Sequence, residues 1–213
     1  LTRIDSTSGK WYDVSAHMLW VGDRTRQLDG AHIEFVRGIE NPIGIKVGPT
    51  TNEEELVKIL DFVNPKNEAG KITLICRMGA DKIDSHLPQI IQKITKEGKN
   101  VVCACDPMHG NTIKSNTGYK TRPVTSIFSE IQKFFTIHRS LGSYPGGVHL
   151  EMTGSDVTEC MGWLQEITDE DLKNRYHTFC DPRLNASQSL EIAFLISEYL
   201  KDDKFLTVKS SQI

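Results

Sequence analysis

One pattern repeats along this chain. A short apolar segment rich in small and β-branched residues ends at a charged or metal-binding residue, and an amphipathic segment of helical period follows. The clearest copy begins at Val101, runs to Cys105 and stops at Asp106-Pro107, with His109 just beyond. The other apolar segments are residues 17–22, 43–49, 72–79 and 148–154. Five such units in succession predict an α/β fold with parallel strands joined by right-handed helical crossovers.

Apolar residues spaced by three and four positions predict the helices between these strands. Leu56, Ile59 and Leu60 show this spacing after a capping sequence at residues 51–54. The other expected helices pass through residues 33–36, begin at about Asp84, contain residues 127–137, and begin at about Ser187. Residues 1–16 and the polar residues 111–122 are expected to be irregular.

Composition limits the class of protein. The 213 residues, 38% of them hydrophobic, suit a single domain with a sizeable core. A net charge of −3 offers no general attraction for nucleic acid, and no apolar run is long enough to span a membrane. Five cysteines without CxxC spacing favour a reducing compartment, so we expect a cytoplasmic protein. No glycine-rich nucleotide-binding motif follows a strand, which makes a nucleotide fold the weaker option.

Three potential metal ligands lie at or beyond predicted strand ends. His109 follows the fourth strand, Glu151 lies in the fifth, and Asp181 comes later in the chain. One imidazole and two carboxylates suit a divalent ion such as manganese, iron or zinc. The residue types alone also allow a turn role for His109 and a helix cap for Asp181. Because carboxylates are rarely buried without a partner, Glu151 is the strongest of the three.

A second group of strand-end residues is basic. Arg24, Lys46 and Arg77 each stand at the end of a predicted strand, and Asp23 accompanies Arg24. Three cations on one rim suit a small substrate with a phosphate and a carboxylate. The open alternatives are a structural ion pair for Lys46 and a solvated helix turn for Arg24.

Six segments together resemble the type II (plant-like) 3-deoxy-D-arabino-heptulosonate 7-phosphate (DAHP) synthases. The resemblance runs from about Asp13 to Leu200, and the segments are WVGDRTRQLDGAH at 20–32, GIKVGP at 44–49, RMG at 77–79, CDPMHGNT at 105–112, GGVHLEMTG at 146–154 and CDPRLN at 180–185. It implies a (β/α)8 TIM barrel and a metal-dependent condensation of phosphoenolpyruvate with erythrose 4-phosphate, the first step of the shikimate pathway.

The resemblance also implies roles for individual residues. The metal ligands would be His109, Glu151 and Asp181, and the ion would be Mn²⁺, with Co²⁺, Fe²⁺ or Zn²⁺ as alternatives. The phosphoenolpyruvate site would contain Asp23, Arg24, Lys46 and Arg77. Catalytic roles would fall to Lys46, Arg77 and His109. A homo-oligomer and aromatic amino acid effectors are implied as well.

Members of this family are about twice as long as this chain. Residues 1–213 are therefore expected to be one catalytic domain that supplies the last five β/α units of the barrel. The first three strands, a Lys-Pro-Arg substrate segment and a fourth, cysteine metal ligand would precede residue 1, and none of the five cysteines matches that ligand. The alternatives are a non-catalytic fragment or regulatory remnant, and another metal-dependent barrel lyase acting on a phosphorylated sugar acid.

Overall fold

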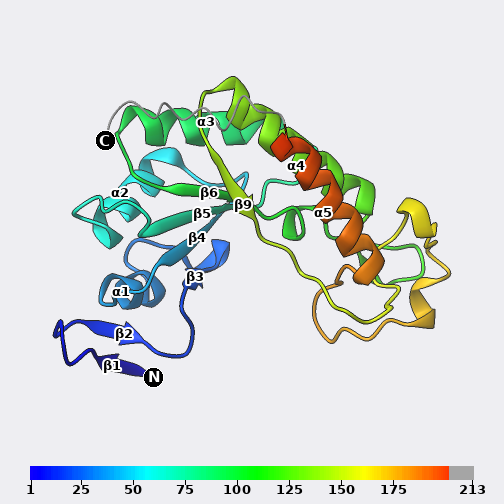
Figure 1. The fold of residues 1–213 in the computed structure, drawn as a ribbon, viewed down its shortest axis with the longest axis horizontal. Helices are drawn as coiled ribbons and strands as arrows, with labels where there is room; N and C mark the ends of the chain where they lie inside the picture. The colour runs from blue at the N-terminus through cyan, green and yellow to red at the C-terminus, as the bar shows by residue number, and fades with distance from the viewer. Residues whose placement is uncertain (202–213) are drawn as a thin grey trace.

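The centre of the protein is a five-stranded parallel sheet. The computed structural model describes residues 1–201, and Figure 1 shows the sheet with helices packed beside it. The strands, in their order across the sheet, are β3 (Leu19–Val21), β4 (Ile43–Val47), β5 (Ile72–Cys76), β6 (Val102–Cys105) and β9 (Pro145–Val148). Because this spatial order follows the order in the sequence, each connection returns the chain to the neighbouring strand, as in a β/α barrel.

The inner strand β4 is apolar because it is buried over its whole length. All five residues of β4 are buried, and Lys46 is its one charged residue. Parallel strands covered on both faces read as continuous apolar runs rather than as alternating ones. This is why the strands could be located by hydrophobicity alone.

Five helices accompany the sheet among residues 1–201. They are α1 (Ala31–Arg37), α2 (Glu53–Val63), α3 (Ile83–Lys96), α4 (Val124–Ser140) and α5 (Ala186–Lys201). Each begins within about three residues of its predicted place. The Asn52 side chain caps α2 by accepting a hydrogen bond from the backbone N–H of Glu55, at 2.9 Å. Helix α4 packs against both α3 and α5, as Figure 1 shows.

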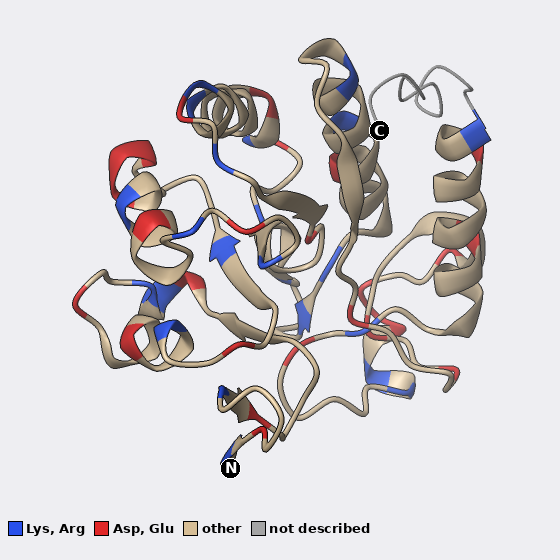
Figure 2. Ribbon diagram, turned by 60° about the vertical axis from the view of Figure 1, so that its left-hand side comes forward, with Lys and Arg blue, Asp and Glu red and all other residues tan. Residues whose placement is uncertain are grey.

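The core lies between the sheet and the inner faces of these helices. Ile59 of α2, Leu87 of α3 and Ile131 of α4 have no exposed surface. Burying one side chain of this size stabilises the fold by about 1.5–3 kcal/mol. Most charged residues of these helices lie away from the sheet, as the colours in Figure 2 indicate, and Glu130 of α4 is a buried exception.

The prediction for the fifth strand was wrong in its limits. The strand spans Pro145–Val148 rather than residues 148–154, and a single further hydrogen bond joins the His149 N–H to the Cys105 carbonyl, at 2.7 Å. A Cβ on Gly146 would lie 2.3 Å from the Val102 side chain, so glycine permits the close pairing with β6. Glu151, which was predicted to lie in this strand, therefore lies beyond it.

Two segments expected to be irregular form hairpins. Residues 1–16 contain β1 (Thr2–Ile4) paired with β2 (Trp11–Asp13), and residues 111–122 contain β7 (Ile113–Lys114) paired with β8 (Lys120–Thr121). Their strands have only two or three residues, which is too short to show the hydrophobic alternation that marks a half-buried strand. The short 3₁₀ helices are η1 (Asp23–Thr25), η2 (His109–Asn111), η3 (Trp163–Gln165) and η4 (Leu172–Asn174).

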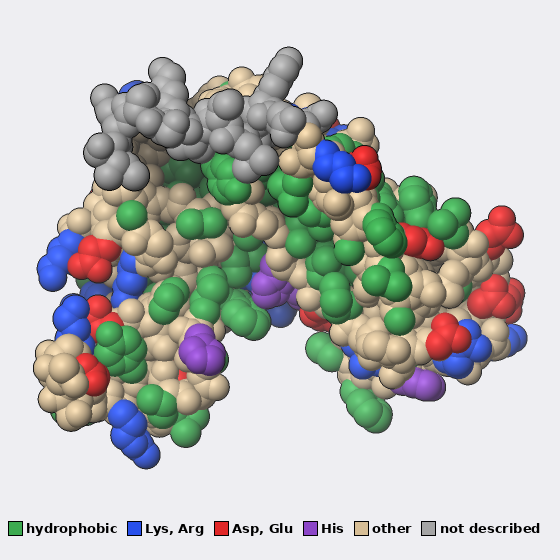
Figure 3. Space-filling view, in the orientation of Figure 1, with side chains coloured by type: hydrophobic (Ala, Val, Ile, Leu, Met, Phe, Trp, Pro, Cys, Tyr) green, Lys and Arg blue, Asp and Glu red, His purple; other side chains and the backbone are tan. Residues whose placement is uncertain are grey.

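The sheet has two open edges within the described residues, β3 and β9. Trp20 on β3 is half exposed, as is Met152 just past β9. Figure 3 shows this face hollowed between the lobe that begins with β1 and the lobe that contains η3 and η4, with hydrophobic side chains along the hollow. None of the helices within residues 1–201 is long and apolar enough to cross a membrane.

Candidate metal and anion site

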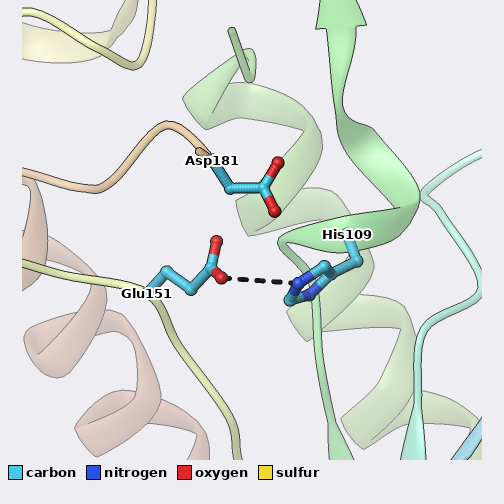
Figure 4. A group of neighbouring side chains, drawn as sticks. All are labelled: His109, Glu151 and Asp181. Atoms are coloured by element: carbon cyan, nitrogen blue, oxygen red, sulfur yellow. Dashed lines mark ion pairs between the residues drawn. The ribbon is translucent and has the colours of Figure 1, made fainter. Parts of the chain in front are cut away.

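Three side chains from three segments converge at the carboxyl end of the sheet. His109 opens η2 after β6, Glu151 lies three residues beyond β9, and Asp181 lies in the loop before α5. Figure 4 shows them facing one another, and one ligand atom from each lies within 4.8 Å of the other two. His109 Nε2 is 3.4 Å from Glu151 Oε1. An imidazole nitrogen with two carboxylate oxygens fits a divalent metal ion.

The orientation of His109 is set by Asp106, the residue that follows β6. Asp106 is fully buried, and its Oδ1 accepts the backbone N–H groups of Met108 and His109 at 3.0 and 3.2 Å. Its Oδ2 lies 2.7 Å from His109 Nδ1. The second ring nitrogen, Nε2, is therefore left for Glu151 or a metal. A carboxylate behind a metal-ligating histidine commonly fixes the ring in this way.

The same contacts control the charges of these groups. Hydrogen bonds to Asp106 and Glu151 raise the pKa of His109 to about 9. Burial acts to raise the pKa of Asp106, but the His109 hydrogen bond and the Lys46 charge outweigh it and hold that pKa well below its usual range. An ion that binds His109 must displace a proton from Nε2, so binding at this site releases a proton.

Both carboxylates of the triad also meet a cation from the segment at β8. Arg122 Nη1 donates to Glu151 Oε2, and Lys120 Nζ lies 2.7 Å from Asp181 Oδ1. Burial acts to raise the pKa of Glu151, but the hydrogen bonds from His109 and Arg122 lower it to about 2. Glu151 is therefore ionised, as a metal ligand must be.

A pocket of about 420 Å³ adjoins the triad through His109. Arg24 and Arg77 line it, together with Asp23 and Lys82. Arg77 Nη1 is 2.9 Å from Asp23 Oδ2, and Nη2 donates to the His109 carbonyl at 3.3 Å. Within residues 1–201 the Arg24 guanidinium has no hydrogen-bond or ion-pair partner, so it is available to an anion.

Lys46 is separate from this pocket. It is 5% exposed and forms a buried ion pair with Asp106 behind His109. The structure thus brings Arg24 and Arg77 to one pocket and places Lys46 in the structural pair that the sequence left open. Arg26 is also buried, between Asp23 Oδ1 at 3.3 Å and Thr51 Oγ1 at 3.1 Å.

Sequence reasoning missed a buried carboxylate that joins the two loops of the site. Glu130 Oε1 on α4 accepts the N–H groups of Met78 and Gly79, each at 2.9 Å, and Oε2 accepts Asn111 Nδ2 at 2.6 Å. A signal was present, because Glu130 stands three positions after Ile127 and four before Phe134, on the apolar face of its helix. Charged residues at such positions are rarely buried without partners.

Glycines let these loops touch. A Cβ on Gly110 would lie 2.4 Å from the backbone nitrogen of Gly79, and a Cβ on Gly79 would lie 2.8 Å from the Gly110 carbonyl oxygen. Gly79 also has φ of +83°, which side chains disfavour. Arg77 and His109 are therefore held on two loops in direct backbone contact.

Residues 1–197 match the sequence model of the Class-II DAHP synthetase family. The chain belongs to this family. It is 54% identical over 202 residues to the phospho-2-dehydro-3-deoxyheptonate aldolase of Streptomyces coelicolor, a match covering 95% of this chain and 45% of that protein. It is 55% identical over 195 residues to the aldolase AroG of Mycolicibacterium smegmatis, covering 92% of this chain and 42% of AroG. This member of the class-II family thus spans less than half the length of these relatives.

Solved structures show the fold that the class-II chain shares. The phospho-2-dehydro-3-deoxyheptonate aldolase of Francisella tularensis aligns with a TM-score of 0.54 and 16% identity, over 86% of this chain and 55% of that one. A truncated 3-deoxy-D-arabino-heptulosonate 7-phosphate synthase from Thermotoga maritima aligns with a TM-score of 0.51 and 16% identity, over 90% and 60%. The predicted α/β class, with part of a β/α barrel, is confirmed.

Proposed function

We propose that this chain carries the metal centre and the phosphoenolpyruvate site of a DAHP synthase. The reaction is the condensation of phosphoenolpyruvate with erythrose 4-phosphate and water, giving DAHP and phosphate. The observation that carries the proposal is that His109 belongs to both the metal-ligand triad and the wall of the basic pocket. A metal-bound aldehyde and a bound anion would therefore meet at one residue. Family membership supports the same activity.

The basic pocket suits the two anionic groups of phosphoenolpyruvate. Among the residues that the structure describes, the Arg24 side chain has no partner, and Arg77 is oriented by Asp23, so two planar guanidinium groups face the same space. Each can form paired hydrogen bonds with a phosphate or a carboxylate. When the phosphate leaves C2, Arg77 would stabilise the charge that it carries away.

His109, Glu151 and Asp181 would hold the divalent ion, which we assign as Mn²⁺, with Co²⁺, Fe²⁺ or Zn²⁺ as alternatives. When bound, such an ion supplies Lewis-acid polarisation of the erythrose 4-phosphate aldehyde. Three ligands from this chain leave room for a further ligand and the substrate. Nitrogen and oxygen donors together suit all four ions.

Lys46 completes the proposed catalytic set with Arg77 and His109. Its ammonium group keeps Asp106 ionised, and Asp106 in turn directs His109 Nε2 toward the other ligands. Lys46 also stands near the carboxyl end of β4, next to the strand that Arg77 follows. To act as a phosphoenolpyruvate ligand, Lys46 would have to turn from Asp106 toward the pocket that Arg24 and Arg77 line.

We further propose that residues 1–213 belong to one catalytic domain, active in the cytoplasm as a homo-oligomer that responds to aromatic amino acids. The support for this set is the family resemblance. No nucleic acid or membrane partner is proposed, since the net charge is −3.

The test uses the complete protein, stripped with a chelator and reloaded with Mn²⁺. His109→Ala should lower formation of DAHP at least about 100-fold, because both metal binding and the contact between the two sites are lost. His86→Ala is the matched control, since His86 lies on α3 outside the triad and bonds only its own helix. Chelator-resistant activity, or full activity of His109→Ala, would disprove the proposed metal centre.

A further inference from the structure

Arg122 occupies an unusual position behind the metal-ligand triad. It follows β8 and has no exposed surface. Its Nε donates to Thr112 Oγ1 at 2.9 Å, and its Nη1 donates to both Glu151 Oε2 and the Pro182 carbonyl. The guanidinium of Arg122 therefore links three segments: Thr112 just after η2, Glu151 after β9, and Pro182 next to Asp181.

Stability alone does not account for an arginine here. Burying a cation is costly unless its hydrogen bonds are complete. Within residues 1–201, Arg122 Nη2 is buried without a hydrogen-bond partner. An incompletely satisfied buried charge that contacts a metal ligand suggests a role in the site.

The loop of Asp181 is held from its other side by Glu159, which is also fully buried. Glu159 Oε2 accepts the Arg183 N–H at 2.8 Å, and Oε1 accepts the Thr178 N–H at 2.8 Å. The Glu159 carbonyl in turn accepts Thr121 Oγ1 at 2.8 Å, next to Arg122. The backbone around Asp181 is therefore fixed between two buried charges, with Arg122 on Pro182 and Glu159 on Arg183.

Lys120 has the same charge as Arg122 but differs from it in exposure and in the number of its contacts. Its side chain is 51% exposed, and its one side-chain contact within the described residues is with Asp181 Oδ1, at 2.7 Å. Exposed pairs of this kind contribute little and exchange readily with solvent. Lys120 can leave Asp181, whereas Arg122 cannot leave Glu151 without opening the buried cluster.

We propose that Arg122 is a positioning residue of the metal centre, holding Glu151 and the Asp181 loop in a ligating arrangement, while Lys120 is a displaceable counter-ion that competes with the metal for Asp181. This inference rests on the proposed metal centre. It assigns opposite effects to two cations that stand two residues apart.

The sign of the effect on metal affinity tests the proposal. If both cations acted only through charge, removing either would strengthen binding of Mn²⁺, because a positive charge near the ligands repels the ion. Positioning predicts the reverse for Arg122. Lys120→Met should bind Mn²⁺ about fivefold more tightly, from the loss of one solvent-exposed repulsion. Arg122→Lys, which keeps the charge but not the three contacts, should bind it about 10- to 100-fold more weakly.

Affinity is measured by calorimetry on the complete, chelator-treated protein, with the electron paramagnetic resonance of Mn²⁺ as a second readout of ligand geometry. Thr112→Val is the second test if Arg122→Lys does not fold, because it keeps the side-chain size and removes the acceptor of Arg122 Nε, together with the hydrogen bond from Thr112 Oγ1 to the Met108 carbonyl at 3.2 Å. It should weaken Mn²⁺ binding about twofold to tenfold. Unfolding of each variant without metal separates lost affinity from lost stability.

The outcomes are distinct. A wild-type protein that binds no Mn²⁺ would overturn the proposed metal centre and this inference with it. A wild type that binds Mn²⁺, with Arg122→Lys at equal or greater affinity, would overturn the positioning role alone. Weaker binding of Mn²⁺ by Lys120→Met would refute the proposal that Lys120 competes with the metal for Asp181. The expected pattern is one variant tighter and the other weaker, with a changed resonance spectrum only for the Arg122 variant.

Discussion

The buried carboxylate of Glu130 should make the stability of this protein depend on pH in a direction opposite to that of most acidic groups. Glu130 has no exposed surface and is bonded by two backbone N–H groups and one amide rather than by a cation. Burial raises its pKa to about 7, from an ordinary value of 4.5. Replacing it with glutamine keeps its size and removes the ionisation.

The size of the effect follows from the two pKa values. Between pH 4.5 and about 7 the folded protein keeps a proton on Glu130 that the unfolded chain has already released. The free energy of unfolding therefore falls as pH rises through this range, and the loss is complete above about pH 7. At about 1.36 kcal/mol per pKa unit, the fall amounts to about 3 kcal/mol. Glu130→Gln lacks this contribution.

Urea unfolding of both proteins at about pH 4.5, 6 and 8 measures the effect, with the linear dependence on denaturant used for each curve. The stability of wild type minus that of Glu130→Gln should fall by about 3 kcal/mol across the series. The contributions of the other titrating groups to the free energy of unfolding cancel in this difference. Glu170→Gln, at an exposed position, is the control and should show a flat difference. A Glu130 difference constant within about 0.5 kcal/mol would refute the reasoning, since a desolvated carboxylate must be linked to pH.

Three further outcomes are expected. Gly110→Ala should destabilise the fold by about 1–3 kcal/mol in urea unfolding, because its Cβ would lie 2.4 Å from the Gly79 nitrogen; wild-type stability would mean that the two loops separate freely. Arg77→Ala in the complete protein should weaken phosphoenolpyruvate binding about 10- to 100-fold by calorimetry, with Arg77→Lys recovering part of it, because charge-assisted hydrogen bonds are worth about 1.5–3 kcal/mol. Unchanged affinity would make the pocket arginines structural. Burial lowers the pKa of His138 to about 4, so the protein should lose stability as pH falls from 6.5 toward 4, and His138→Phe should not share this loss in acid unfolding. Identical acid unfolding of the two would contradict a neutral, buried imidazole.

The elements that sequence could predict are those whose pattern is dictated by burial. Strand β4 is a continuous apolar segment in the core, and helix α2 packs one apolar face against the core. Both lie within a few residues of their predicted places. The hairpin of β7 and β8 could not be predicted, because its residues are exposed or polar and only its backbone pairing marks it. The fifth strand was placed too late in the sequence because Gly146 and Gly147 look like a turn, yet the close approach of β6 requires a glycine at position 146.

In the candidate site, too, some residues could be predicted from the sequence and others could not. The strand-end rule placed His109 and Arg77 correctly on adjacent loops, because topology alone brings carboxyl ends of parallel strands together. It could not show that Lys46 is paired with Asp106, since a lysine in an apolar strand is equally consistent with a ligand site. Arg122 and Glu130 were missed because their partners are backbone groups or distant side chains, which no local spacing reveals.

The partners missing from the sequence prediction explain how the charges of the site are balanced by other side chains of the protein. Lys46, Asp106, His109, Glu151 and Arg122 make one continuous line of contacts in which positive and negative groups alternate, with the imidazole at the centre. An ion bound to His109 Nε2 would also place positive charge between the carboxylates of Asp106 and Glu151, so positive and negative groups would still alternate. Each buried charge then retains an opposite neighbour in both states, and the large cost of an unpaired buried charge is avoided. If the site binds the proposed ion, its buried members need no rearrangement, and the exposed Lys120 is the group that would have to move.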